Sequence, residues 1–427
     1  TWPAAHVTWN SRGMIVRPAA TPATPAATPA AADHSPRTPR VPTTAAATRA
    51  IVAAAAVGAL IAGQAPAHAQ SGGLDAEQVF GTSAELITPG SLNPLVELGN
   101  LPGSSGSSMV NLADLVGLSP DMVVEDVPLP PPPDSDITET EVVGEPVVDG
   151  RYEQWRITSH RMQRELVVEV YRAPEDAGAA PTLYLLDGIE SELPSGFIQA
   201  GAREWFADQN VNLVIPTGGQ GSLWADWEQQ DPNLGIVRWE SFLIHDLPGL
   251  VEPHLDSNDK RGVGGISMGA SAALTLATRH PGFYDAVFGV SGCYSPAGIG
   301  ETLARYTVQT GGGDPQNMWG PSGASGWAAH DALANAENLR GTAIHLSSGT
   351  GMASQEDWEN TGHRAGRLLV GMAIEQATGQ CTRAAADRFD QLDIPADVVI
   401  HPTGLHSWSR FGPAIQQAWQ SVEGALR

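Results

Sequence analysis

The sequence predicts an α/β domain in which a mostly parallel central sheet is covered by helices on both faces. From about residue 146 onward, short and nearly continuous apolar runs alternate with helical segments. Such runs are typical of strands that are buried on both faces, as in parallel sheets. A second observation is the turn Gly265-x-Ser267-x-Gly269, which lies between an apolar run and an Ala-rich segment.

The predicted elements follow in chain order. Segments 152–158 and 165–171 alternate with period two, which predicts an antiparallel pair of strands. Further buried strands are predicted at 181–188, 212–216, 263–266, 286–292, 343–348 and 396–400. Helices are expected at 239–250, from 270 to about 280, and at 413–426.

Three segments precede this domain, which we place at 146–427. Residues 1–48 are rich in Ala, Pro and Thr and are expected to stay disordered. Residues 49–69 join Arg49, an apolar run and Ala67-His68-Ala69, which predicts a secretory signal peptide cleaved after Ala69. We therefore expect translation to begin closer to Arg49. An Ala-rich helix that tethers the protein to a membrane is the alternative.

Residues 70–145 form a leader rich in Gly, Ser, Pro and acidic residues. Its proline run at 128–133 is expected to be stiff and extended. The leader either crosses the cell envelope as a loosely packed spacer or wraps around the catalytic domain, and both interpretations fit its composition.

Composition excludes some classes of function. The 427 residues carry a net charge of −24. Such a protein repels the phosphates of a nucleic acid, which argues against a nucleic-acid partner. A hydrophobic content of 42% with 12 tryptophans predicts a substantial core. No CxxC or HExxH spacing occurs, so neither a metal nor another cofactor is predicted. Cys293 and Cys381 could form a disulfide or remain two free thiols.

The Gly265-x-Ser267-x-Gly269 turn is the nucleophile-elbow pattern of an α/β-hydrolase fold. It predicts that Ser267 sits on a strained strand-to-helix turn with its hydroxyl exposed. The two glycines are needed because a Cβ at either position would collide with the neighbouring strand or helix.

A catalytic serine of this fold is followed in the chain by an acid and then by a histidine. His406 lies after the last predicted strand and before the final helix, where a general base belongs. The loop after the strand at 343–348 offers Glu356 and Asp357 side by side, and we prefer Glu356 as the acid that orients the imidazole. Two backbone N–H groups, those of Met268 and Ile189, are expected to form the oxyanion hole.

Several short motifs extend this pattern. They are Tyr184–Gly188, Pro216–Gln220, Asp226-Trp227, Trp239–Leu243, Gly265–Met268, Met318–Ser322 and His406–Trp408. With them the chain resembles the secreted mycolyltransferases of the antigen 85 family and their corynebacterial relatives, within the broader esterase D-like group. The resemblance covers roughly residues 150–427.

The resemblance implies an activity and a set of partners. The family transfers a mycolic acyl group from trehalose monomycolate to trehalose or to cell-wall arabinan through an acyl-serine. Trehalose mycolates and cell-wall glycolipids are thus the implied partners, with a cell-envelope location and a monomeric state. By position, Asp187 matches the aspartate that binds the sugar, and Ser267, His406 and the Glu356 region match the triad. A disulfide between Cys293 and Cys381 is also expected from the corynebacterial branch.

Aromatic faces suit both sugars and lipids. Asp226, Trp227, Trp319 and Trp408 are therefore candidates to line the substrate cleft, with packing in the core or at the rim as the alternative.

The chain departs from the family at three places. Glu190 stands where the antigen 85 pattern has an arginine, and a strict reading of the acid loop places Gln355 at the acid position. The 70–145 leader has no counterpart in the compact mycobacterial members. A secreted serine carboxylesterase, with water as the acceptor, is the alternative activity. An inactive binding or matrix-adhesion protein is a third interpretation.

Overall fold

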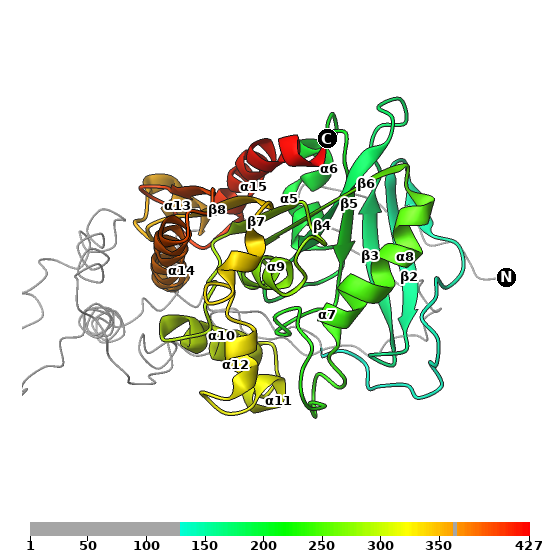
Figure 1. The fold of residues 1–427 in the computed structure, drawn as a ribbon, viewed down its shortest axis with the longest axis horizontal. Coiled ribbons are helices and arrows are strands. Elements are labelled where there is room, and N and C mark those ends of the chain that lie inside the picture. The colour runs from blue at the N-terminus through cyan, green and yellow to red at the C-terminus, as the bar shows by residue number, and fades with distance from the viewer. Residues whose placement is uncertain (1–128, 362–364) are drawn as a thin grey trace, which may run out of the picture. The chain divides into compact units, whose positions relative to one another are not determined.

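The computed structural model describes residues 129–361 and 365–427 (Figure 1). The predicted extension 1–48, the signal peptide 49–69 and most of the 70–145 leader lie outside the described residues. Within these two ranges, no helix is both long and apolar enough to cross a membrane.

A nine-stranded sheet forms the centre of the domain, in the order β1-β2-β3-β5-β4-β6-β7-β8-β9. The first three strands and the β3–β5 pair are antiparallel, and the pairs from β5 through β9 are parallel. The predicted antiparallel pair and the mostly parallel sheet are both confirmed. The strands are β1 (Val147–Asp149), β2 (Tyr152–Ser159), β3 (Arg164–Tyr171), β4 (Ala180–Leu186), β5 (Asn212–Pro216), β6 (Ser257–Ile266), β7 (Ala286–Val290), β8 (Ala343–Ser348) and β9 (Asp397–Ile400).

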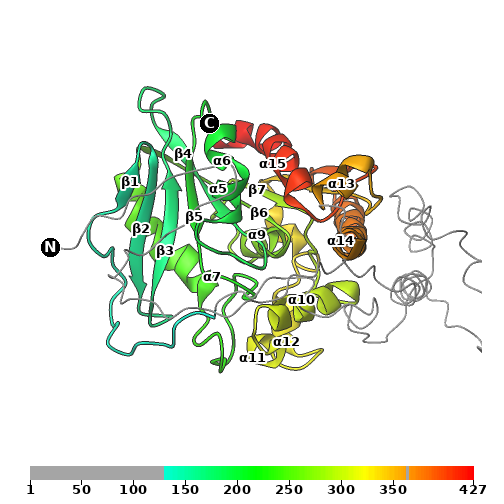
Figure 2. The same ribbon diagram turned by 180° about the vertical axis from the view of Figure 1, so that it is seen from behind.

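Helices cover both faces of the sheet, and successive strand residues point to opposite faces. Leu183 and Leu185 of β4 pack with α5 (Gly196–Ala200), α6 (Ala202–Trp205) and α15 (Trp408–Val422). Tyr184 and Leu186 belong to the other cluster. That cluster includes side chains of α7 (Trp239–Ser241), α8 (Leu247–Val251), α9 (Met268–Arg279), α10 (Ile299–Thr310), α11 (Pro315–Trp319), α12 (Ser325–Ala329) and α14 (Ala365–Gln391) (Figures 1 and 2). β4 and the carboxyl half of β6, which lead to the loops of the site, are thus buried on both sides.

The helix expected at 239–250 is present but irregular. Between α7 and α8 the chain runs through a π-helical segment, Phe242–Asp246. Pro248 follows at the start of α8 and has no N–H to donate to the carbonyl four residues back. The wider π turn accommodates this missing hydrogen bond.

The folded domain begins earlier than the predicted boundary at residue 146. The N–H of Asp134 donates to Gln163 O at 2.7 Å, and that of Val143 donates to Arg156 O at 2.8 Å. Val142 also forms an isolated bridge with Ile157 of β2. Residues 134–143, assigned to the leader from composition, therefore pack against the first hairpin as part of the domain.

Two helices between β8 and β9 were not predicted. A short one, α13 (Gln355–Asn360), follows the loop after β8, and the 27-residue α14 then returns to β9. Because α14 packs against β8 and β9, its side chains reach the carboxyl ends of the parallel strands, where sites form in open α/β sheets.

Candidate active site

Ser267 occupies the turn between β6 and α9. Its backbone has φ 52° and ψ −117°, a conformation that residues other than glycine rarely adopt. A Cβ on Gly265 would clash with the backbone of Gly269, and a Cβ on Gly269 would clash with the carbonyl of Leu186. The predicted need for both glycines is confirmed, since only they allow strand and helix to approach this closely.

His406 approaches Ser267 from the loop between β9 and α15. Its Nε2 lies 2.8 Å from the Ser267 Oγ, and its Nδ1 lies 2.9 Å from an oxygen of Glu375. A carboxylate oxygen accepts, so Nδ1 carries the proton and Nε2 presents its lone pair to the serine hydroxyl. The three side chains form a relay suited to serine activation.

Glu375 of α14 is a buried carboxylate with many donors. It is 2% exposed and accepts from Ser291 Oγ at 2.7 Å, Ser348 Oγ at 3.1 Å and the Gly349 N–H at 2.5 Å. Burial alone would raise the pKa of Glu375, but the His406 contact and the hydrogen bonds from Gly349 and Ser291 together lower it below its usual value. Glu375 therefore stays ionised and can stabilise a charged imidazole on His406.

The prediction of Glu356 as the acid is wrong. Glu356 is an exposed residue in the first turn of α13, and the imidazole contacts Glu375 instead. The alternative, Asp357, accepts from the Ser354 N–H at 2.8 Å and from its hydroxyl at 2.7 Å, and so completes a capping box at the start of α13. The acid comes from a helix because α14, and not the loop after β8, lies against His406.

A signal for Glu375 is present in the sequence. Residues spaced three, four or seven apart along α14 are all buried: Leu368, Met372, Glu375, Thr382, Ala385 and Phe389. A glutamate within such a buried helical stripe needs a partner, because an unpaired buried charge is costly. Recognising the helix would have made Glu375 a candidate.

The two residues predicted to supply the oxyanion donors line the same cavity as the nucleophile. Met268 is the first residue of α9, so its N–H has no intrahelical acceptor. In the loop after β4, the Gly188 N–H donates to Asp187 at 2.7 Å, which leaves the N–H of Ile189 as the next donor in this loop. Ile189, Met268 and Ser267 line one cavity.

That cavity has a volume of about 910 Å³, and Ser267 and His406 lie at its wall. Trp319 and Trp408 line it, as expected. Trp408 packs edge-to-face on Phe197 and Phe411, with ring centroids 5.6 and 5.7 Å away. Much of the remaining wall is apolar, including Ile266, Leu303, Val370, Ile374 and Leu405. A space of this size and polarity suits a large amphipathic ligand.

Asp187 also reaches the cavity, although its carboxylate is already hydrogen-bonded. Its two oxygens accept from the N–H groups of Gly188 at 2.7 Å and Gly196 at 2.6 Å. Burial raises the pKa of Asp187 to about 6, and the two backbone donors only partly offset this. The side chain thus shapes the loop that carries Ile189, in addition to facing the cavity.

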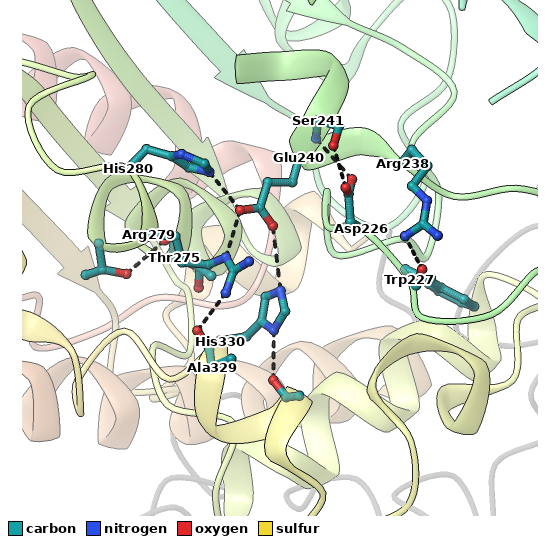
Figure 3. A network of polar contacts seen from close by, with 12 residues as sticks. Asp226, Trp227, Arg238, Glu240, Ser241, Thr275, Arg279, His280, Ala329 and His330 are labelled. Atoms are coloured by element: carbon teal, nitrogen blue, oxygen red, sulfur yellow. Dashed lines mark hydrogen bonds and ion pairs between the residues drawn. The ribbon is translucent and has the colours of Figure 1, made fainter. Parts of the chain in front are cut away.

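Asp226 and Trp227 do not line the cavity, so their predicted placement in the cleft is wrong. Asp226 accepts from the backbone N–H of Ser241 at 3.0 Å and from its hydroxyl at 2.6 Å (Figure 3). Trp227 is 1% exposed and donates to Ser222 O at 3.0 Å. The hydrogen bonds of both residues stabilise the loop before α7, so their role is structural.

Cys293 and Cys381 form a disulfide, as expected from the resemblance. It joins the loop after β7 to α14 across 88 residues of sequence. Ser291, two residues before Cys293, donates to Glu375, which lies on the same helix as Cys381. The bridge therefore ties the acid-bearing helix to the strand beside the nucleophile.

Loss of this disulfide is expected to destabilise the domain by about 4 kcal/mol, because a closed loop of this length restricts the unfolded chain. The Cys293→Ser/Cys381→Ser variant should unfold at a lower temperature than the oxidised protein. Differential scanning calorimetry with and without reductant measures this. An unchanged unfolding temperature in both cases would contradict it.

Within the described residues, no group of three or more His, Cys, Asp or Glu side chains is arranged to hold a metal ion.

The chain is similar to known esterases and mycolyltransferases. Residues 159–421 match the family described as "Putative esterase". The chain is 34% identical over 290 residues to the diacylglycerol acyltransferase/mycolyltransferase Ag85A of Mycobacterium tuberculosis, covering 64% of this chain and 81% of that protein. It is also 30% identical over 291 residues to Ag85B of Mycobacterium avium, covering 64% and 83%.

Solved structures show the same fold. Mycobacterium tuberculosis MPT51 aligns with a TM-score of 0.54 at 22% identity, covering 65% of this chain and 100% of that one. An S-formylglutathione hydrolase from Agrobacterium tumefaciens aligns with a TM-score of 0.51 at 14% identity, covering 67% and 100%. At these identities the likeness supports the α/β-hydrolase fold alone.

Proposed function

Because this chain belongs to the esterase family that includes the antigen 85 mycolyltransferases, we propose that it is a serine-dependent mycolyltransferase. It transfers a mycolic acyl group from trehalose monomycolate to trehalose or to cell-wall arabinan. The observation that carries the proposal is the Ser267–His406–Glu375 relay, whose serine and histidine lie at the wall of a large, partly apolar cavity.

The first half-reaction forms an acyl-serine. His406 Nε2 takes the proton of Ser267 while the Oγ bonds to the ester carbonyl carbon, and Glu375 stabilises the imidazolium. The N–H groups of Met268 and Ile189 bind the oxyanion of the tetrahedral intermediate. When this intermediate collapses, the bond to the trehalose oxygen breaks and His406 gives that oxygen its proton.

The second half-reaction reverses these roles with a new alcohol. An acceptor sugar hydroxyl gives its proton to His406 and attacks the acyl-serine carbonyl. Collapse forms the new ester and returns the proton to Ser267. Water in place of the sugar would give free acid, so the carboxylesterase alternative uses the same acyl-enzyme and differs only in the acceptor.

The test is to incubate purified protein with trehalose monomycolate and excess trehalose, and to quantify dimycolate and free mycolic acid by mass spectrometry. We expect dimycolate as the main product. Free acid as the main product at saturating trehalose would favour the esterase instead.

We further propose that the protein acts at the cell envelope after export. The support is the signal-like pattern at 49–69, which lies outside the described residues. Secreted protein should begin near Gln70 by N-terminal sequencing. A mature N-terminus upstream of Arg49 would reject this export route.

A further inference from the structure

The cavity follows helix α9 away from the nucleophile. Ser271 and Thr275, spaced four residues apart after Ser267, line the cavity on one helix face. At a rise of about 1.5 Å per residue, Thr275 lies roughly 12 Å along the axis from Ser267. Leu303 and Ala304 of α10 also line the cavity. A long acyl chain on Ser267 could extend along this wall.

Trp319 and His330 close the wall near the far end of α9. Their rings stack with centroids 4.1 Å apart and planes inclined by 16°. Both residues line the cavity. Arg279, in the last turn of α9, donates to Ala329 O at 2.9 Å, which places His330 beside that end of the helix. The stacked pair therefore lies far along α9 from Ser267.

A buried carboxylate holds this end together, as Figure 3 shows. The side chain of Glu240 is 7% exposed, and one of its oxygens lies 2.7 Å from both Arg279 Nε and His280 Nε2. Its other oxygen faces His330 Nε2 at 3.7 Å, which is too long for a hydrogen bond. Burial alone would raise the pKa of Glu240, but His280, His330 and Arg279 together hold it well below its usual value.

His330 is fixed by a hydrogen bond at one ring nitrogen and faces Glu240 with the other. Its Nδ1 lies 2.8 Å from Gly326 O, and because a carbonyl only accepts, Nδ1 carries a proton. Nε2 then faces the Glu240 carboxylate at 3.7 Å. The ring held in this plane stacks on the indole of Trp319, with centroids 4.1 Å apart. The orientation of Trp319 thus depends on the contact between Glu240 and His330.

We propose that Glu240 and His330 are positioning residues that hold Trp319 as the end wall of the acyl part of the cavity and so limit the length of acyl chain accepted. The inference rests on the proposed function, because it takes the cavity beyond Ser267 as the site of a long alkyl chain. Neither residue touches the reacting atoms.

The experiment measures kcat/KM for p-nitrophenyl esters from butyrate to palmitate. The readout is the ratio of the palmitate value to the butyrate value. Trp319→Ala is expected to raise this ratio by about tenfold, the order of discrimination that a few atoms of apolar pocket provide. His330→Ala and Glu240→Gln should raise it in the same direction by a smaller factor, because they loosen the wall without removing it.

Glu252→Gln is the matched control. Glu252 is also a partly buried glutamate, bonded to Arg261 at 2.7 and 2.6 Å and to Tyr184 at 2.8 Å, and it does not line the cavity. Its variant should lose stability comparably and leave the ratio unchanged. Trp319→Phe, which keeps an aromatic ring, provides a second reading should Glu240→Gln fold poorly, and it should raise the ratio less than Trp319→Ala.

If the Trp319 and His330 variants change all esters by one common factor, the positioning role is wrong. The result is separable from the proposed function, because the ester series needs no sugar acceptor. Suppose that the variants shift the palmitate-to-butyrate ratio but the wild-type protein forms no dimycolate. The proposal of a sugar acceptor would then be wrong, and the proposal that Trp319 forms the end wall would stand.

Discussion

Replacing Ser267 with alanine is expected to lower kcat/KM on any acyl ester by about 10⁶-fold, since triad serines act as a unit with their base. The His406 Nε2, 2.8 Å from the hydroxyl, then has no proton to accept from the protein nucleophile. Residual rates about 10³-fold above uncatalysed hydrolysis should persist, because the backbone donors of the oxyanion hole are untouched.

Covalent labelling measures the same variant independently of substrate. A fluorophosphonate probe should increase the mass of the wild-type protein by that of one bound probe molecule and leave the mass of Ser267→Ala unchanged. Thermal unfolding shows whether the variant is folded. A labelled, active Ser267→Ala protein would place the nucleophile elsewhere. Absence of label on the wild-type protein would support the inactive binding protein instead.

Glu375→Gln is the second variant with a large expected effect, a fall in kcat of about 10⁴-fold. The carboxylate accepts from the His406 Nδ1 at 2.9 Å, and an amide can present its NH₂ group there instead. That would favour the wrong imidazole tautomer and remove the charge that stabilises the imidazolium. The substitution is nearly isosteric, so KM should change little.

Glu356→Gln is the matched control for Glu375→Gln. Glu356 is exposed at the start of α13, so its variant should retain wild-type kcat within a factor of two or so, as expected for surface sites. Steady-state kinetics of both variants on p-nitrophenyl butyrate decide between the two glutamates. A large loss for Glu356→Gln with little for Glu375→Gln would restore the acid inferred from sequence.

Features encoded over a few adjacent residues could be predicted from the sequence. The nucleophile elbow was one, because steric limits within a single strand-to-helix turn require glycine at positions 265 and 269. The alternating strands of the first hairpin were another, since period two is a local property. His406 could be placed because chain order in this fold puts the base after the last strand.

The acid and the far wall of the cavity were decided only by tertiary structure. Glu375 reaches His406 because α14 folds back against β8, and the spacing of Glu375 from the strand does not reveal that contact. Asp226 and Trp227 form a family-like motif, yet their side chains bond to Ser241 and Ser222 and do not line the cavity. Local steric limits and periodicity depend only on residues that are close in the sequence. By contrast, the pairing of a helix side chain with a distant loop depends on how whole elements pack, which the sequence specifies only through the complete fold.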